Sequence, residues 1–303
     1  MNFGQLLTAM VTPFDQNGDV DFNLTRNLVN YLIENGTEGL VVAGTTGESP
    51  TLTTEEKVEL FRFVVEVVDG RIPVIAGTGS YNTRESIQLT KLAEKTGVDG
   101  VMLVVPYYNK PSQEGLYQHF KAIAESTELP VMLYNIPGRT GINMTVETTV
   151  RLAQIPNITA IKDASGNLDA MSEIIRQTPD GFSLYSGDDG VTLPVLSIGG
   201  TGVISVASHV IGKEMQTMIK HFMSGNHQKA AEMHRSLLPI MKALFAAPNP
   251  TPVKAALNLA GVPVGGVRLP LIPLTDEETS TLKDVLNQLQ ETENKIEEEE
   301  AAS

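Results

Sequence analysis

The sequence predicts an α/β fold, a TIM (β/α)8 barrel that carries a C-terminal three-helix appendage. Short apolar runs recur eight times at intervals of about 30 residues, and a segment with helical periodicity follows each of them. Runs such as Val101–Val105 are almost wholly apolar, which is typical of parallel strands covered by helices on both faces. Eight such units fit a closed barrel, and a doubly wound sheet is the alternative.

The strands and the helices between them can be placed in chain order. Thr53 and Glu56, after the second run, have the spacing of a helix capping box, and apolar residues follow it at helical period. The eight predicted strands are Leu6–Val11, Gly39–Ala43, Pro73–Ala76, Gly100–Val105, Pro130–Asn135, Ile158–Asp163, Phe182–Ser186 and Gly202–Val206.

The strand signals stop after about residue 224, and three helices are predicted beyond it. They are Gln228–Ala246, Pro252–Leu259 and a helix that begins at the capping box of Thr275 and Glu278. We therefore expect a barrel domain over residues 1–224 and a C-terminal helical region over residues 225–303. The acidic run Glu297–Glu300 is expected to be a frayed, solvated tail.

Composition excludes several classes of function. The 303 residues have 22 basic and 36 acidic side chains, so the net charge of −14 disfavours nucleic acid and anionic membranes as partners. The absence of cysteine excludes disulfides and thiolate chemistry. No apolar run is long enough to span a membrane and no signal-peptide layout is seen, so the expected compartment is the cytoplasm.

Lys162 is the most informative single residue, because it lies near the end of an apolar strand run. Apolar surroundings favour the neutral amine, which forms a Schiff base with a ketone. Chemistry in such barrels collects where strands end. The alternative is a strand-end lysine that reaches solvent or pairs with a carboxylate.

Other strand ends carry groups that suit the same chemistry. Tyr134, on the neighbouring strand, can shuttle protons for an amine. Thr45 and Thr46 lie in a tight turn whose amides and hydroxyls can hold a carboxylate, and the planar guanidinium of Arg139 suits a second one. The alternatives are a core tyrosine, an ordinary glycine-rich turn and a loop arginine paired with a surface acid.

The remaining motifs argue against a cofactor or a metal. Gly77 and Gly79 lack the third glycine of a dinucleotide fingerprint. The glycine-rich stretch 199–202 precedes the last strand, so it is expected at the opposite end from Lys162, which argues against a pyridoxal phosphate lysine. The histidines show no metal-ligand spacing, and Asp188 and Asp189 are interpreted as a polar loop.

Taken together, the strand-end motifs resemble the dihydrodipicolinate synthase family. The resemblance extends from Leu7–Pro13 to Arg268–Pro270. Within that range, Asn249–Lys254 resembles the C-terminal part of the family. Sialic acid lyases, which look otherwise similar, tend to carry an aliphatic residue at the place of Arg139. The motifs are GTTGE with Thr45, PYY with Tyr108, YNIPGRTG with Tyr134 and Arg139, and IKDASG with Lys162.

The resemblance implies a substrate pair and a reaction. Pyruvate forms a Schiff base with Lys162, and the derived enamine attacks the aldehyde of L-aspartate 4-semialdehyde. Cyclisation then gives 4-hydroxy-tetrahydrodipicolinate, the entry compound of diaminopimelate and lysine biosynthesis. Thr45, Tyr134 and Tyr108 resemble the family's proton relay, with Tyr108 supplied across a dimer interface.

The resemblance also assigns the binding groups. Amides of Thr45 and Thr46 hold the pyruvate carboxylate, and Arg139 holds the carboxylate of the second substrate. Gly187 and Ile204 line the pocket through backbone groups. The family implies a homodimer at least, and a homotetramer built as a dimer of dimers is expected.

Regulation is where this sequence departs from part of the family. Members inhibited by lysine have histidines at the positions of Thr54 and Lys57 and an asparagine at the position of Tyr81. Ser49, Glu85 and Tyr107 match those members. The six residues therefore predict a degenerate allosteric site.

Two other functions remain open from the sequence. One is another pyruvate-dependent Schiff-base aldolase, such as a sialic acid or keto-deoxy-gluconate lyase, which keeps Lys162 and Tyr134 and leaves Arg139 without a role. The other is a non-catalytic barrel that binds a keto acid as a sensor.

Overall fold

Eight parallel strands close into a barrel in chain order, with β8 paired to β1. The computed structural model describes residues 3–301, with side chains over residues 3–289. The closed order confirms the predicted TIM barrel and excludes the doubly wound sheet, which has two open edges. The strands are β1 (Leu6–Ala9), β2 (Gly39–Val42), β3 (Val74–Gly77), β4 (Gly100–Val104), β5 (Val131–Asn135), β6 (Ile158–Asp163), β7 (Ser183–Ser186) and β8 (Gly202–Ser205).

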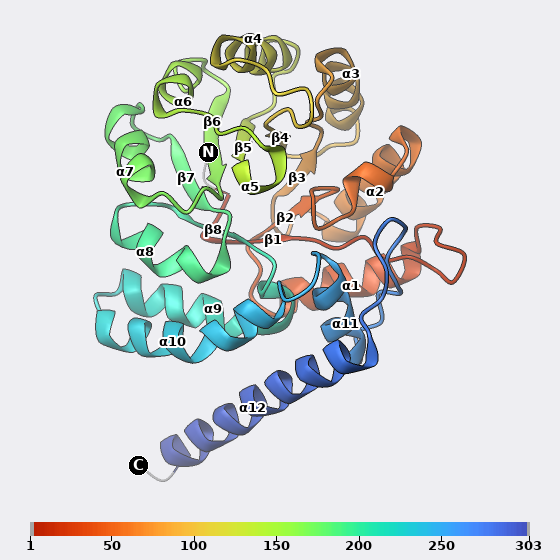
Figure 1. The fold of residues 1–303 in the computed structure, drawn as a ribbon, viewed down its shortest axis with the longest axis vertical. Helices are drawn as coiled ribbons and strands as arrows, with labels where there is room; N and C mark the ends of the chain where they lie inside the picture. The colour runs from red at the N-terminus through yellow and green to blue at the C-terminus, as the bar shows by residue number, and fades with distance from the viewer. Residues whose placement is uncertain (1–2, 302–303) are drawn as a thin grey trace.

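Helices surround the strands as an outer ring (Figure 1). The capping box predicted at Thr53 and Glu56 is present at the start of α2. Short helical turns follow β2, β5 and β7; they are η1 (Ser49–Thr51), α5 (Pro137–Thr140) and η2 (Asp189–Val191). The ring consists of α1 (Phe22–Glu34), α2 (Thr54–Val68), α3 (Thr83–Glu94), α4 (Gln113–Ala124), α6 (Val146–Leu152), α7 (Leu168–Gln177), α8 (Thr192–Ser197) and α9 (Ser208–Met223).

Apolar side chains fill two layers, one between the strands and the helices and one inside the barrel. The inner layer includes Met132 and Tyr134 from β5 and Ala160 from β6. Side chains alternate along a strand, so Lys162 faces the same way as Ala160. The fold therefore points the amine of Lys162 into the barrel at the carboxyl end of β6.

Three helices follow the ring, as predicted: α10 (His227–Ala243), α11 (Thr251–Leu259) and α12 (Asp276–Ala301). The capping contacts between Thr275 and Glu278 are present. Leu237 and Leu257 belong to the same apolar cluster as the ring helices, and the domain division at residue 224 stays a prediction.

The last helix, α12, lies along the lower edge of the molecule in Figure 1 and contacts α10 and α11. Its backbone is helical through residues 297–300, whose side chains lie outside the described residues, so the frayed, solvated tail also stays a prediction. Across residues 3–301, no helix has both the length and the apolar character needed to cross a membrane.

Candidate active site

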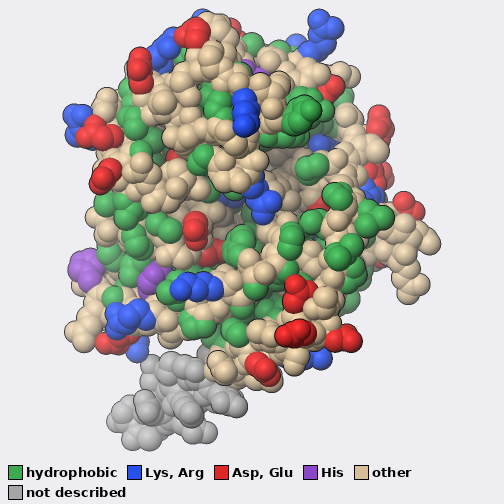
Figure 2. Space-filling model, viewed as in Figure 1, with side chains coloured by type: hydrophobic (Ala, Val, Ile, Leu, Met, Phe, Trp, Pro, Cys, Tyr) green, Lys and Arg blue, Asp and Glu red, His purple; other side chains and the backbone are tan. Residues whose placement is uncertain are grey.

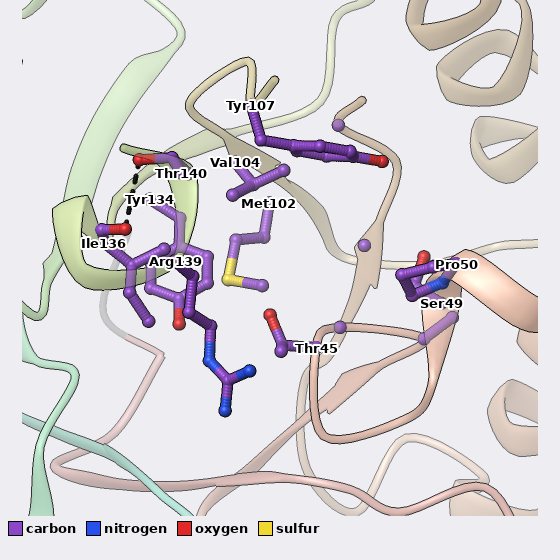
Figure 3. Close-up of a pocket in the computed structure, with 14 residues that line it drawn as sticks. Thr45, Ser49, Pro50, Met102, Val104, Tyr107, Tyr134, Ile136, Arg139 and Thr140 are labelled. Carbon is purple, nitrogen blue, oxygen red and sulfur yellow. Dashed lines mark hydrogen bonds between the residues drawn. The ribbon is translucent and has the colours of Figure 1, made fainter. Parts of the chain in front are cut away.

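A cavity of about 230 Å³ opens at the carboxyl ends of the strands. The space-filling view shows a hollow near the centre of this face (Figure 2). Residues in or just after β2, β3, β4 and β5 line the cavity, among them Thr45, Met102, Tyr134 and Arg139. The hydroxyls of Thr45 and Tyr134 and the guanidinium of Arg139 point toward one another (Figure 3). Three of the predicted strand-end groups therefore share one space.

Lys162 lies beside this group. Strand pairing sets it opposite Tyr134, and its Nζ is 4.4 Å from the centroid of the Tyr134 ring. Burial lowers the pKa of Lys162 to about 8, although the charge of Asp189 opposes the shift. At pH 7 such an amine is about one-tenth neutral, against about 0.03% for an ordinary lysine. The apolar surroundings expected from the sequence therefore make the amine a usable nucleophile.

Tyr134 is a buried phenol that keeps its proton at neutral pH. Burial raises its pKa to about 12, while a side-chain hydrogen bond with Thr45 and the charge of Arg139 act in the opposite direction. A protonated phenol can donate to a nearby oxygen, and its hydrogen bond with Thr45 offers a path for the proton to return. The pair Tyr134–Thr45 is therefore suited to proton transfer next to the Lys162 amine.

The turn Gly44–Glu48 after β2 presents free donors. The amides of Thr45 and Thr46 donate to no acceptor among the described residues, although Thr46 is 3% exposed. The turn ends at Glu48, whose φ of 56° is left-handed and costs a non-glycine residue about 1 kcal/mol or more. Adjacent unpaired amides in a tight turn form a site for an anionic group such as a carboxylate.

Arg139 reaches the cavity from α5, a single helical turn. Pro137 occupies its first turn, where the missing N–H costs no hydrogen bond. Gly141, with a φ of 72°, ends the turn in the left-handed conformation. Arg139 is exposed and lines the cavity, so its guanidinium is available to an anion entering from solvent.

Two further predicted residues lie at the barrel end without lining this cavity. A Cβ on Gly187 would lie 2.7 Å from Cβ of Ala164 and 3.2 Å from Cε of Lys162, so only glycine fits without a shift. Ile204 is 1% exposed and belongs to the inner apolar layer with Tyr134. The contribution of their backbone groups to substrate binding stays a prediction.

Tyr108 is the one predicted catalytic residue that the structure leaves apart. It is 91% exposed, has a φ of 68° and does not line the cavity, whereas its neighbour Tyr107 does. A bulky aromatic held in the left-handed region and turned to solvent is unusual within a single chain. Its role from a partner subunit stays a prediction.

Five of the six residues of the predicted allosteric site lie near the cavity. Ser49 and Tyr107 share its lining. The rings of Tyr81 and Tyr107 meet edge to face with centroids 5.1 Å apart, and the charge of Glu85 acts on both Tyr107 and Lys57. Thr54 is exposed at the first turn of α2 and lines a different, shallow hollow.

Asp189, predicted from the sequence to be part of a polar loop, is a buried carboxylate. It is 2% exposed, and its Oδ2 accepts hydrogen bonds from the amides of Val206 and Ala207. Burial raises the pKa of Asp189, and its charge favours the protonated form of Lys162. The neighbouring sequence does not indicate that Asp189 is buried while the adjacent Asp188 is exposed.

Lys254 is a second buried lysine, and it was not predicted from the sequence as a functional residue. It forms an ion pair of 2.8 Å with Glu48, and both side chains are at most 2% exposed. Lys254 lies among apolar residues of α11, as Lys162 does in its strand, so the same sequence signal could have identified it. Over the described part of the chain, no group of three or more histidine or acidic side chains is placed to hold a metal ion.

Comparison with known proteins gives full-length matches. The model of the dihydrodipicolinate synthetase family matches residues 2–289. A Bacillus velezensis protein named 4-hydroxy-tetrahydrodipicolinate synthase is 63% identical over 289 residues, which cover 95% of this chain and 100% of that protein. Halalkalibacterium halodurans has a 4-hydroxy-tetrahydrodipicolinate synthase 1 that is 65% identical over 95% of this chain and 97% of its own length.

Solved structures agree with these sequence matches. The dihydrodipicolinate synthase crystal structure from Bacillus anthracis is 63% identical, with a TM-score of 0.94 over 95% of this chain and 98% of that chain. A chloride-inhibited dihydrodipicolinate synthase from Acinetobacter baumannii, complexed with pyruvate, is 42% identical, with a TM-score of 0.92 over 95% of this chain and 99% of that chain.

Proposed function

The chain belongs to the dihydrodipicolinate synthetase family, and from this premise we infer its reaction. It is a 4-hydroxy-tetrahydrodipicolinate synthase, a lyase that condenses pyruvate with L-aspartate 4-semialdehyde in lysine and diaminopimelate biosynthesis. One observation carries the chemical assignment to this chain: a buried amine, with its pKa lowered to about 8, lies 4.4 Å from the ring of a protonated phenol.

The first half of the reaction forms the nucleophile. Neutral Nζ of Lys162 attacks the ketone carbon of pyruvate, and the carbinolamine oxygen takes up a proton and leaves as water. Tyr134, whose ring centroid lies 4.4 Å from Nζ of Lys162, supplies this proton, and Thr45 returns one to it. Loss of a proton from the pyruvate methyl group converts the Schiff base into the enamine.

The second half forms the carbon–carbon bond and frees the enzyme. The enamine carbon attacks the aldehyde, and the aldehyde oxygen takes up a proton as it becomes the hydroxyl. The amino group of the second substrate then attacks the Schiff-base carbon, closes the ring and displaces Lys162. Overall, one pyruvate and one aspartate semialdehyde give the product and one water.

Binding follows the placement of the donors. The unpaired amides of Thr45 and Thr46 hold the pyruvate carboxylate next to Lys162. Arg139, at the exposed side of the cavity, binds the carboxylate of the second substrate as it arrives. Backbone groups of Gly187 and Ile204 complete the wall.

We also propose an oligomeric state and a cellular compartment for this enzyme. Tyr108 completes the proton relay from a partner subunit, so the working unit is at least a homodimer, and a dimer of dimers is the expected tetramer. The exposed, left-handed Tyr108 supports this assignment because its ring is available to enter the site of a partner subunit. The enzyme is assigned to the cytoplasm, the compartment expected from its sequence.

A trapping experiment tests the assignment of Lys162. The protein is incubated with pyruvate, reduced with borohydride and mapped by mass spectrometry. We expect one adduct, on Lys162, with the buried Lys254 as the internal control that stays unmodified. Lys162→Ala should take up no adduct and lose turnover while it keeps its circular dichroism spectrum. An adduct on another lysine, or full turnover by Lys162→Ala, contradicts the mechanism.

A turnover assay with alternative aldehydes tests the substrate. Parent protein and pyruvate are offered aspartate semialdehyde, N-acetylmannosamine or glyceraldehyde. Turnover with aspartate semialdehyde alone supports the synthase. Equal or better use of either sugar aldehyde supports another Schiff-base aldolase, and an adduct without any turnover supports a sensor.

A further inference from the structure

The C-terminal segment holds the carboxylate-binding turn through a buried ion pair. Nζ of Lys254, on α11, donates to Oε1 of Glu48 at 2.8 Å and to the carbonyl of Gly266 at 2.6 Å. It also lies 4.1 Å from the centroid of the Phe14 ring. With the amine satisfied in this way, Lys254 is not available as a nucleophile.

Glu48 connects this ion pair to the turn. It is the last residue of Gly44–Glu48, and its second oxygen, Oε2, accepts from the amide of Arg268 at 2.9 Å. The guanidinium of Arg268 in turn donates to the carbonyl of Thr51 at 2.7 Å. Both carboxylate oxygens of Glu48, and the backbone just after it, are therefore fixed by the C-terminal segment.

Asn249 holds the middle of the same turn. Its Nδ2 donates to Oγ1 of Thr46 at 3.0 Å, and both side chains are buried. The two free amides, of Thr45 and Thr46, therefore lie in a turn that is anchored at Thr46 and again at Glu48. A turn this short transmits a displacement of either anchor directly to its amides, and binding geometry tolerates only small errors.

We propose that Asn249 and Lys254 are positioning residues that set the affinity for pyruvate by holding the amides of Thr45 and Thr46 in place. The inference rests on the proposed function, since it takes those amides as the pyruvate carboxylate site. Arg139 belongs to α5 and is held by its own turn, with its amide bonded to the carbonyl of Ile136. Loosening the Gly44–Glu48 turn should therefore leave affinity for the second substrate unchanged.

A purely structural role makes a different prediction. A buried ion pair contributes little net stability, yet removing one partner strands a buried charge and destabilises the fold. If Lys254 and Asn249 only support the fold, their variants melt at lower temperature but bind pyruvate normally. The split between the two Michaelis constants separates the two roles.

The experiment compares Asn249→Ala and Lys254→Met with a matched control. Asn258→Ala removes two hydrogen bonds from the same segment, to Gly265 and Val264, without touching the turn. We expect the KM for pyruvate, and the pyruvate concentration for half-maximal borohydride trapping, to rise about tenfold in the first two variants. The KM for aspartate semialdehyde should stay within about twofold, and Asn258→Ala should change neither constant.

A double-mutant cycle sharpens the assignment for Asn249. In a Thr46→Val background the Asn249 amide has lost its partner, so Asn249→Ala should raise the pyruvate constant no further. Asn249→Ala leaves the ion pair intact, so it still decides the question if Lys254→Met does not fold.

Three outcomes overturn the inference. Unchanged pyruvate constants with a lowered melting temperature assign both residues to stability alone. Equal rises in both Michaelis constants show a general distortion of the site, and full additivity in the cycle removes the link through Thr46. Absence of any pyruvate adduct on the parent protein is distinct from all three, because it overturns the proposed function as well.

Discussion

Lys162 and Lys254 are both buried lysines, and burial lowers the pKa of each to about 8. Their partners differ. Lys254 donates to a carboxylate and a carbonyl, whereas no ion pair of the described residues includes Lys162. Burial alone therefore does not make a lysine reactive. The reactive lysine is the buried one whose amine has no fixed hydrogen-bond acceptor.

The lowered pKa of Lys162 gives a prediction for pH. Only the neutral amine attacks pyruvate, so the rate of adduct formation should rise about tenfold per pH unit below pH 8 and level off above it. Rapid quenching with borohydride between about pH 6 and 10 measures this. Asp189→Asn should move the midpoint to lower pH, because it removes a charge that favours the protonated amine. A midpoint near 10 would contradict the assignment.

Arg139→Ala should impair the use of aspartate semialdehyde and spare pyruvate, the opposite of what is expected for Asn249→Ala and Lys254→Met. A lost charge-assisted hydrogen bond costs about 1.5–3 kcal/mol, so kcat/KM for aspartate semialdehyde should fall roughly ten- to a hundredfold. Half-saturation by pyruvate should change little. Arg139→Lys, which keeps the charge without the planar fork, serves as the intermediate control. Equal loss for both substrates would remove Arg139 from its assigned role.

At the scale of elements, the start of α2, the start of α3 and the segment after β4 form the candidate regulatory region. Tyr81 packs edge to face on Tyr107, and Asn109 donates to the carbonyl of Tyr81 at 3.1 Å. Burial lowers the pKa of Lys57, while the charge of Glu85 opposes that shift. The aromatic pair fills space, and Lys57 brings a cation near the acid that an incoming ammonium needs.

Free lysine should therefore inhibit this enzyme weakly or not at all. Three altered contacts of about 1 kcal/mol each would lower lysine affinity by roughly two decades. A lysine titration of the turnover rate measures the effect, and half-inhibition below about 1 mM would contradict it. As a control, Tyr81→Asn should strengthen whatever inhibition remains, since it removes the ring and restores a compact amide.

Regular elements were predictable because their signal is local. The β6 boundaries match the prediction, and seven other apolar runs each contain or overlap a strand, because strands buried on both faces appear as uninterrupted apolar sequence. The capping box at Thr53 was equally visible, since its two members lie three residues apart. The one-turn elements α5 and η2 have no periodicity to detect.

The site was predictable only in part, for the same physical reason. Lys162 and Tyr134 lie near the ends of strands, Thr45 and Arg139 follow strands, and a barrel brings strand ends together. The burial of Asp189 depends on amides 17 and 18 residues away, and Lys254 meets a partner 206 positions away. Contacts between residues so far apart in the sequence cannot be predicted from the pattern of neighbouring residues.

At the scale of the whole molecule, the exposed Tyr108 is the residue on which the proposed dimer depends. Its backbone adopts a left-handed conformation that turns the ring to solvent, away from its own cavity. In a two-fold dimer the same feature serves both sites, because each subunit gives its tyrosine and receives one.

Mixing two inactive variants tests that exchange. Tyr108→Phe subunits keep Lys162, and Lys162→Ala subunits keep Tyr108, so a mixed dimer should contain one complete site. Random exchange should restore about a quarter of the parent activity, since half of the dimers are mixed and each has one working site. As a control, an equal mixture of Tyr108→Phe and parent subunits should keep about half of the parent activity before and after exchange, so a rise in activity belongs to the complementary pair. No recovery after verified exchange would return Tyr108 to its own chain.

The link between the Gly44–Glu48 turn and the C-terminal segment also affects when, during synthesis of the chain, this turn can reach its final geometry. Thr46 and Asn249 are 203 positions apart, and Glu48 and Lys254 are 206 apart. At ribosomal rates of about 5–20 residues per second, the anchors emerge roughly 10–40 s after the turn that they hold. A nascent chain completes all eight strands before Asn249 is made, so the barrel can close while its pyruvate site is still loose. Catalytic competence should then be among the last properties that each new molecule acquires.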